Sequence, residues 1–124
     1  MQRDRLAAAQ SLATRLAAVV VLKGSGTVIA APGLAPHINP TGNGLLAGGG
    51  SGDVLAGWIG AFWAQADTTD PLAARWATEA AAWLHGRAAD CLLARAPGSL
   101  ALPAGDLSEQ MRETAALRRT PLRR

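Results

Sequence analysis

The sequence lacks a second cysteine, tyrosine and any long hydrophobic run. Cys91 is its single cysteine, so an internal disulfide is excluded and no oxidising compartment is indicated. No apolar stretch approaches the roughly 18 residues that a membrane-spanning helix needs. The polar residues 1–5 are not followed by the apolar core of a signal peptide. We therefore expect a soluble, cytoplasmic protein in which Cys91 is a buried, unreactive thiol.

Excess positive charge is confined to one end of the chain. Residues 112–124 carry five arginines against one glutamate, a net charge of +4, whereas residues 1–111 carry seven basic and eight acidic residues, a net charge of −1. The positive charge thus lies in a terminal segment rather than on a folded face. We predict one domain over residues 1–111, a basic frayed tail over 112–124, and neither a nucleic-acid nor a membrane partner.

The first half of the chain predicts one helix and two strands. Apolar residues recur at helical spacing over residues 3–18. The β-branched run from Val19 to Leu22 is typical of a strand buried on both faces, and residues 27–30 predict a second strand. Glycine, proline and asparagine are frequent in residues 34–52, which we expect to form a loop.

Three helices are predicted after this loop. The first begins between Ser51 and Asp53 and is apolar nearly all round up to residue 65, so we expect it to be buried. The second is capped by Asp70, with Pro71 at its first position, and extends to about residue 95. The third covers residues 107–117. With only two evident strands, this order of elements indicates one end of a larger layered α/β domain.

The glycine-rich segment before the first of these helices is suited to binding an anion. Residues 48–52 read Gly-Gly-Gly-Ser-Gly, and glycine lets backbone N–H groups approach a ligand closely. A helix start adds unpaired N–H donors and the positive end of the helix dipole. Asp53 supplies a carboxylate in the same turn. An anion site with a base beside it is what phosphoryl transfer to a hydroxyl requires.

Taken alone, these residues leave alternatives open. Asp53 can simply cap the helix, and the spacing matches neither a Walker loop nor a dinucleotide-binding fingerprint. Lys23 can reach a phosphate or be a solvated loop lysine. His85 has no second ligand at metal spacing, so a packed or surface histidine is favoured over a catalytic one, and no metal ligand is predicted. The four tryptophans fall on predicted helices and are expected to fill the core or an interface.

Three motifs together resemble those of the ADP/ATP-dependent NAD(P)H-hydrate dehydratases, a family with the ribokinase-like fold. The longest, from Asn39 to Gly57, contains Asn-Pro-Thr-Gly-Asn at 39–43 and Gly-Gly-Ser-Gly-Asp at 49–53. Residues 20–28 are similar to a second motif of the family, and residues 84–90 to a third. The sequence departs from the family at residues 44–46 and 48 without a change of length. The resemblance implies the C-terminal portion of a ribokinase-like α/β/α layered domain, with few strands and several helices.

The resemblance also implies a reaction and a set of site residues. Members of the family repair hydrated NADH and NADPH: ADP or ATP phosphorylates the hydroxyl of the hydrate, and phosphate then leaves. Asp53 would contact the hydrate and remove its hydroxyl proton. By the same resemblance, the adenine nucleotide would be bound by Lys23, Gly24, Ser25, Gly26, Thr27 and Gly52. The anion hole would be formed by Gly49, Gly50, Ser51 and Gly52. Mg²⁺ would accompany the nucleotide, and the family often forms tetramers, so a homo-oligomer is expected.

Some points stay open at this stage. Asn39, Thr41 and Asn43 either orient the substrate or form ordinary loop turns. The motifs do not distinguish ADP from ATP, and the N-terminal half of the family's domain is absent from these 124 residues. Two other functions are compatible with the sequence. One is a vitamin-precursor kinase of the same fold, which shares the Gly-x-Gly-Asp loop but not the Asn-x-Thr-Gly-Asn run. The other is a truncated, non-catalytic remnant that associates with itself or with a partner.

Overall fold

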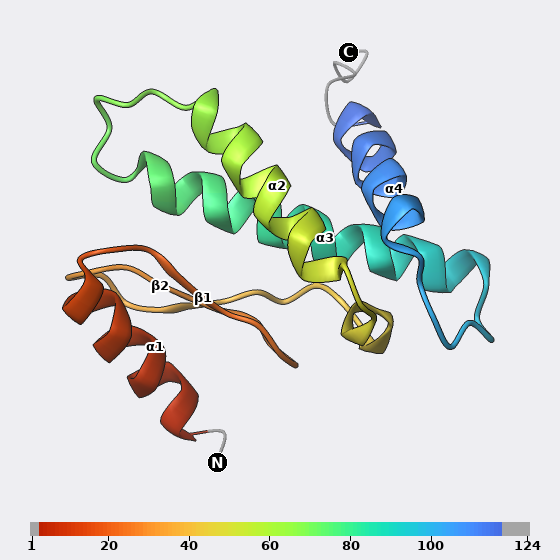
Figure 1. The fold of residues 1–124 in the computed structure, drawn as a ribbon, viewed down its shortest axis with the longest axis horizontal. Coiled ribbons are helices and arrows are strands. Elements are labelled where there is room, and N and C mark those ends of the chain that lie inside the picture. Colours follow the sequence, from red (N-terminus) through yellow and green to blue (C-terminus); the bar gives the residue numbers. More distant parts are fainter. Residues whose placement is uncertain (1–2, 118–124) are drawn as a thin grey trace, which may run out of the picture.

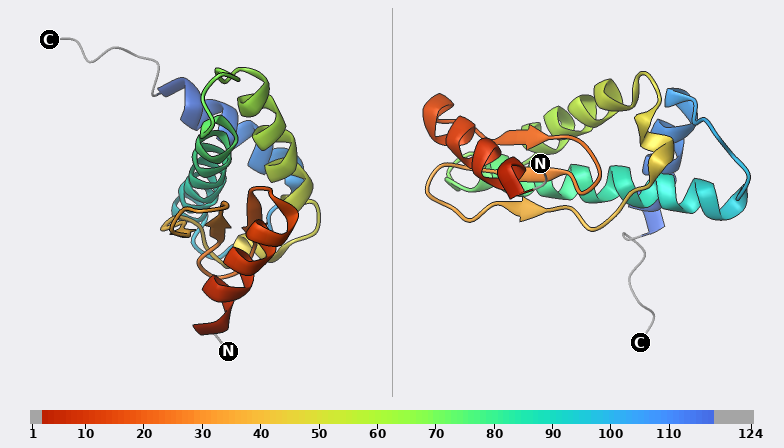
Figure 2. Two further views of the ribbon diagram at one scale, coloured as in Figure 1. Left: turned by 90° about the vertical axis from the view of Figure 1, so that its left-hand side faces the viewer. Right: turned by 90° about the horizontal axis from the view of Figure 1, so that it is seen from below.

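The computed structural model describes residues 3–117, which are arranged in layers. A small sheet has helix α1 on one side and helices α2 and α3 on the other, and helix α4 packs on α2 and α3 away from the sheet (Figure 1). Figure 2 shows the same layering from two further directions. The predicted layered α/β class is confirmed. None of the helices within residues 3–117 is long and apolar enough to cross a bilayer.

Helix α1, Arg3–Leu16, covers one face of the sheet with small side chains. Ala9 and Ala13 are buried there. The helix ends two residues earlier than predicted because Ala17 takes a left-handed φ of 50°. The Ala18 N–H then donates to the Ala13 carbonyl at 3.2 Å, which satisfies a carbonyl at the end of the helix.

The sheet contains three antiparallel strands in the order β1–β2–β3. Their bounds are Val20–Leu22 for β1, Val28–Ala30 for β2 and His37–Ile38 for β3. All three residues of β2 are buried, whereas those of β1 are half-buried. Residues 19–22 were predicted to form a strand buried on both faces. Helices do cover both faces of β1, but its residues are only half-buried, and β2 is the fully buried strand. β2 has that position because it is paired along both of its edges, whereas β1 lies at an edge of the sheet.

The continuous apolar run of β1 nevertheless has a structural reason. Val20 and Leu22 face α1, whereas Val19 and Val21 face α2 and α3. Because helices cover both faces, no position along the strand favours a polar side chain. The open feature of β1 is its edge, since among the described residues it pairs only with β2.

The segment predicted as loop, residues 34–52, contains regular structure. β3 lies within it, and a 3₁₀ helix, η1, spans Gly44–Ala47. The Asn43 side chain begins η1 by accepting a hydrogen bond from the Leu45 N–H at 3.0 Å. Short elements of this kind have too few residues for a periodic pattern. The glycine and proline content of the segment therefore led to the prediction of a loop.

Helix α2, Ser51–Ala64, begins as predicted but is not buried. Only Ser51 and Leu55 are buried, and the Trp63 side chain is about half exposed. The prediction of a buried helix was wrong because α2 packs through one stripe, against α3, α4 and the sheet, while its outer face is open within the described structure.

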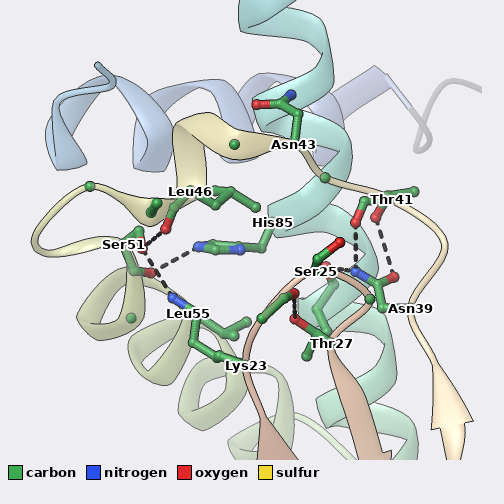
Figure 3. A pocket seen from close by; sticks show the side chains of 18 residues that line it. Lys23, Ser25, Thr27, Asn39, Thr41, Asn43, Leu46, Ser51, Leu55 and His85 are labelled. Carbon is green, nitrogen blue, oxygen red and sulfur yellow. Dashed lines mark hydrogen bonds between the residues drawn. The ribbon is translucent and has the colours of Figure 1, made fainter. Parts of the chain in front are cut away.

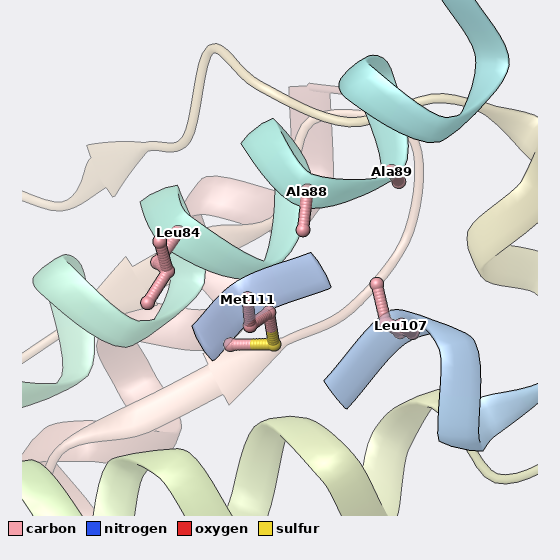
Figure 4. Packing of buried hydrophobic residues seen from close by; sticks show 5 residues of the cluster. All are labelled: Leu84, Ala88, Ala89, Leu107 and Met111. Carbon is pink, nitrogen blue, oxygen red and sulfur yellow. The ribbon is translucent and has the colours of Figure 1, made fainter. Parts of the chain in front are cut away.

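Helix α3, Ala73–Arg95, is central to the core, and α4, Ala104–Leu117, packs on it. Asp70 does not cap α3, since its carboxylate accepts from the Leu72 N–H at 2.8 Å and the helix begins after that turn. Figure 4 shows the shared core of α3 and α4, which consists of Leu84, Ala88, Ala89, Leu107 and Met111.

The C-terminal segment differs from its expected frayed state over part of its length. Residues 112–117 belong to α4, where Thr114 is buried and Ala115 packs against the core that α4 shares with α3. The remainder of the predicted tail, 118–124, lies outside the described residues. Cys91 is partly exposed rather than buried.

Candidate functional site

A cavity of about 670 Å³ opens where the β1–β2 turn, the loop after β3, the start of α2 and the middle of α3 meet (Figure 3). It gathers segments that are far apart in the sequence, namely residues 23–27, 39–48, 51–52 and 82–85. Every residue assigned to the adenine nucleotide lines this cavity. Of the anion-hole residues, Ser51 and Gly52 line it, whereas Gly49 and Gly50 do not.

The start of α2 presents a cation and helical N–H groups to the cavity. Gly50 precedes the helix with a left-handed φ of 84°, a conformation that glycine tolerates. The Lys23 ammonium donates to the Ser51 hydroxyl at 3.0 Å, and this hydroxyl donates to the Leu46 carbonyl at 2.6 Å. A β-carbon on Gly52 would lie 3.6 Å from the Lys23 nitrogen. Lysine and helix dipole together make this the most favourable place for an anion in the cavity.

His85 supports the same helix start from α3. Its side chain is 3% exposed, and Nε2 lies 2.8 Å from the Ser51 carbonyl oxygen. Because a carbonyl only accepts, Nε2 carries the proton. Burial lowers the pKa of His85 below 6.5; the Ser51 carbonyl opposes this shift, and the nearby Lys23 charge adds to it. A packed histidine was favoured from the sequence, but its support of Ser51 was not foreseen.

The loop that follows β3 is fixed to the backbone of α3. The buried Asn39 donates its amide to the Ala82 carbonyl at 3.0 Å, and the Thr41 hydroxyl donates to the Trp83 carbonyl at 2.9 Å. Asn39 and Thr41 line the cavity, as Asn43 does. Their hydrogen bonds within the chain give them a structural function, and substrate orientation by these three side chains stays a prediction.

Gly86 and Asp90 complete this attachment, and the sequence interpretation missed both roles. A β-carbon on Gly86 would lie 2.5 Å from the carbonyl carbon of Thr41, so only glycine allows the loop to approach α3 this closely. The Asp90 carboxylate accepts from the Gly42 N–H at 3.1 Å and from the Asn43 amide at 3.0 Å. The available signal was the i, i+4 spacing of these two residues within the motif at 84–90, which places them on one face of a helix.

Asp53 lies in the first turn of α2 but does not line the cavity. Its side chain is exposed and accepts no hydrogen bond from the described residues. Successive helical residues point about 100° apart, so Gly52 faces the cavity while Asp53 faces the adjoining surface. The helix start thus separates the cavity, which Gly52 lines, from the exposed surface on which Asp53 lies.

The side chains that line the cavity do not include the carboxylates by which proteins usually bind magnesium. No carboxylate lines the cavity, and within residues 3–117 there is no cluster of three histidine, cysteine or acidic residues. Mg²⁺ prefers oxygen ligands and retains several waters. The residues present therefore do not form a magnesium site, and any Mg²⁺ here would have to be held by phosphate oxygens and water.

Comparison with known proteins identifies related sequences. A family model described as NAD(P)H-hydrate dehydratase matches residues 1–113. An ADP-dependent (S)-NAD(P)H-hydrate dehydratase from Neisseria meningitidis is 40% identical over 112 residues, which are 90% of this chain and 36% of the relative. A bifunctional NAD(P)H-hydrate repair enzyme from Gloeobacter violaceus is 46% identical over 92 residues, 74% of this chain and 17% of the relative.

The fold is shared with a solved structure. The ADP/ATP-dependent NAD(P)H-hydrate dehydratase of Bacillus subtilis, co-crystallised with ATP and Mg²⁺, superposes with a TM-score of 0.77 at 35% identity. The match covers 94% of this chain and 40% of that one. The chain thus spans well under half the length of the relatives that it matches here.

Proposed function

We propose that this chain, which belongs to the NAD(P)H-hydrate dehydratase family, supplies the nucleotide site and the general base for the repair of hydrated NADH and NADPH. The observation that carries this proposal is the position of Lys23 at the start of α2, where its ammonium bonds to Ser51 inside a cavity large enough for a nucleotide. The relatives support it, because the Neisseria protein is named ADP-dependent and the Bacillus protein was crystallised with ATP and Mg²⁺.

In the proposed reaction the phosphate chain of ADP or ATP lies against Lys23 and the N–H groups at Gly52. The hydroxyl of the hydrate approaches from the exposed side of the helix start, where Asp53 accepts its proton as the oxygen attacks the terminal phosphorus. The phosphorylated hydrate then loses phosphate, and the nicotinamide ring is restored. Lysine and helix N–H groups stabilise the charge that develops on the transferred group. We assign this role to the domain within residues 1–111, acting in a homo-oligomer.

The test is an assay of the purified chain with NADH hydrate and ADP or ATP, following recovery of the NADH absorbance. Asp53→Asn should retain the fold and nucleotide binding but lower turnover on the order of 10²–10⁴-fold, since an amide does not accept the proton. Near-normal turnover by this variant would remove Asp53 from the mechanism. Phosphorylation of vitamin-precursor alcohols instead of the hydrate would favour the kinase alternative. Nucleotide binding without turnover in any assembly would favour a non-catalytic remnant.

A further inference from the structure

Arg5 on α1 contacts the turn that lines the cavity, from outside the cavity. Its Nη1 donates to the Ser25 carbonyl at 2.8 Å, and its Nη2 donates to the Leu22 and Lys23 carbonyls, each at 3.2 Å. Arg5 is not among the residues that line the cavity, whereas residues 23–27 are. One guanidinium therefore holds three carbonyls of the turn proposed to bind the adenine nucleotide.

The direction of these bonds fixes the direction of the peptide groups. None of the described peptide bonds is cis, and in a trans peptide the C=O and N–H point in opposite directions. With the Leu22, Lys23 and Ser25 carbonyls held by Arg5, the N–H groups of the same three peptides point away from α1. Carbonyl oxygens, which would repel a phosphate, are thereby kept on the side of the turn that faces α1.

Gly24 makes this arrangement possible. Its φ of 153° is unusual for residues with a side chain, and a β-carbon at this position would lie 2.6 Å from the Arg5 Nη2 atom. The contact also suits arginine in particular, because a planar guanidinium offers five N–H donors in a fixed fork. A lysine has one nitrogen and does not reach carbonyls on both sides of Gly24 with the same geometry.

We propose that Arg5 is a positioning residue for the adenine-nucleotide site. It acts on the ligand through the turn of residues 23–27, whose conformation it holds before the ligand binds. This inference rests on the proposed nucleotide site. It adds a residue from α1, outside all three sequence motifs, to the machinery of that site.

The experiment is a calorimetric titration of ADP into the full chain and three variants. Arg5→Ala should weaken ADP binding by about tenfold, the scale of one lost charge-assisted contact, and Arg5→Lys should weaken it less. Arg15→Ala is the matched control, since Arg15 lies on the same helix, is exposed, and makes no hydrogen bond or ion pair with the described residues; its ADP affinity should equal that of the wild type. All titrations are made where circular dichroism shows each variant to be folded.

A chemical rescue separates positioning from a general loss of stability. Millimolar methylguanidinium should restore ADP affinity to Arg5→Ala but not change that of the wild type. ADP affinity equal to the wild type in both Arg5 variants would overturn this inference and leave the proposed function intact. Weakened ADP binding that methylguanidinium does not restore would have the same consequence. Absence of ADP and ATP binding by the wild type would overturn the proposed function together with this inference. If Arg5→Ala does not fold, Arg5→Lys, which keeps the charge and the aliphatic stem, decides alone: equal affinity to wild type contradicts the proposal.

Discussion

Ser51 is the residue at which the elements of the site are joined. Its hydroxyl bonds to Lys23 and Leu46, and its carbonyl bonds to His85. The sequence placed Ser51 in an anion hole through its glycine neighbours, but it gave no information on these partners, which are distant along the chain. A motif predicts where the backbone comes close to a ligand, whereas the side chains that hold this backbone depend on tertiary packing.

The state of His85 predicts a pH dependence of stability. Burial lowers the pKa of His85 below 6.5 in the folded protein. As the pH falls, His85 is therefore protonated more readily in the unfolded chain than in the folded one. The free energy of unfolding is therefore largest above about pH 6.5, and it falls as the pH drops below this value. The measurement is denaturant unfolding between pH 7.5 and 5.

His85→Gln provides the comparison for this prediction. A glutamine amide can still donate to the Ser51 carbonyl but does not titrate, so the decrease below pH 6.5 should become smaller. His37→Gln removes the other histidine and leaves His85 in place, so its pH profile should follow the wild type. A profile of His85→Gln that matches the wild type would show that another group causes the pH dependence.

At the scale of elements, packing of the 39–43 loop on α3 should be highly sensitive to one added carbon atom. Gly86→Ala places a methyl group 2.6 Å from the Thr41 carbonyl oxygen, which forces the loop or the helix to move. We expect a loss of about 1–3 kcal/mol in the free energy of unfolding, as for other overpacked cores. Urea unfolding followed by circular dichroism measures this change.

Gly60→Ala is the matched control for this substitution. Gly60 lies in α2, and no atom lies within 4 Å of the position of an added β-carbon. Alanine also has a higher helix propensity than glycine, so this variant should be unchanged or more stable by up to about 1 kcal/mol. A Gly86→Ala protein as stable as Gly60→Ala would contradict the close packing of loop and helix.

The elements show where sequence reasoning succeeded and where it could not. The two strands, the helix at Ser51 and the long helix α3 were predicted, because each has a periodic or continuous apolar pattern. The extent of burial was overestimated for β1 and α2, because an apolar sequence shows that a face can be buried and not how completely it is covered. Which strand is central depends on its neighbours in the sheet. The short β3 and η1 gave no pattern, and Arg5 gave no signal because its partners are backbone carbonyls.

At the scale of the whole molecule, an apolar groove of about 620 Å³ runs beside β1 and shares no lining residue with the cavity at the start of α2. Its lining includes Val19, Val21, Ile59, Trp63 and Leu72. Trp63 is 53% exposed, and the neighbouring strand β1 pairs only with β2 among the described residues. Exposed apolar surface and an open strand edge both favour association with another chain.

We therefore expect the purified chain to self-associate and to be a poor enzyme as an isolated monomer. Multi-angle light scattering at micromolar concentration should give a mass above that of one chain. Trp63→Gln should shift the distribution towards the monomer, because a polar side chain in the groove weakens apolar contacts.

Trp76→Gln is the control: Trp76 is 52% exposed but does not line the groove, so its mass distribution should follow the wild type. Equal shifts in both variants would show that general surface hydrophobicity, not the groove, drives association. A dilute wild-type monomer with full dehydratase activity would contradict the prediction, because it would mean that neither the edge of β1 nor the groove needs a partner for the site to function.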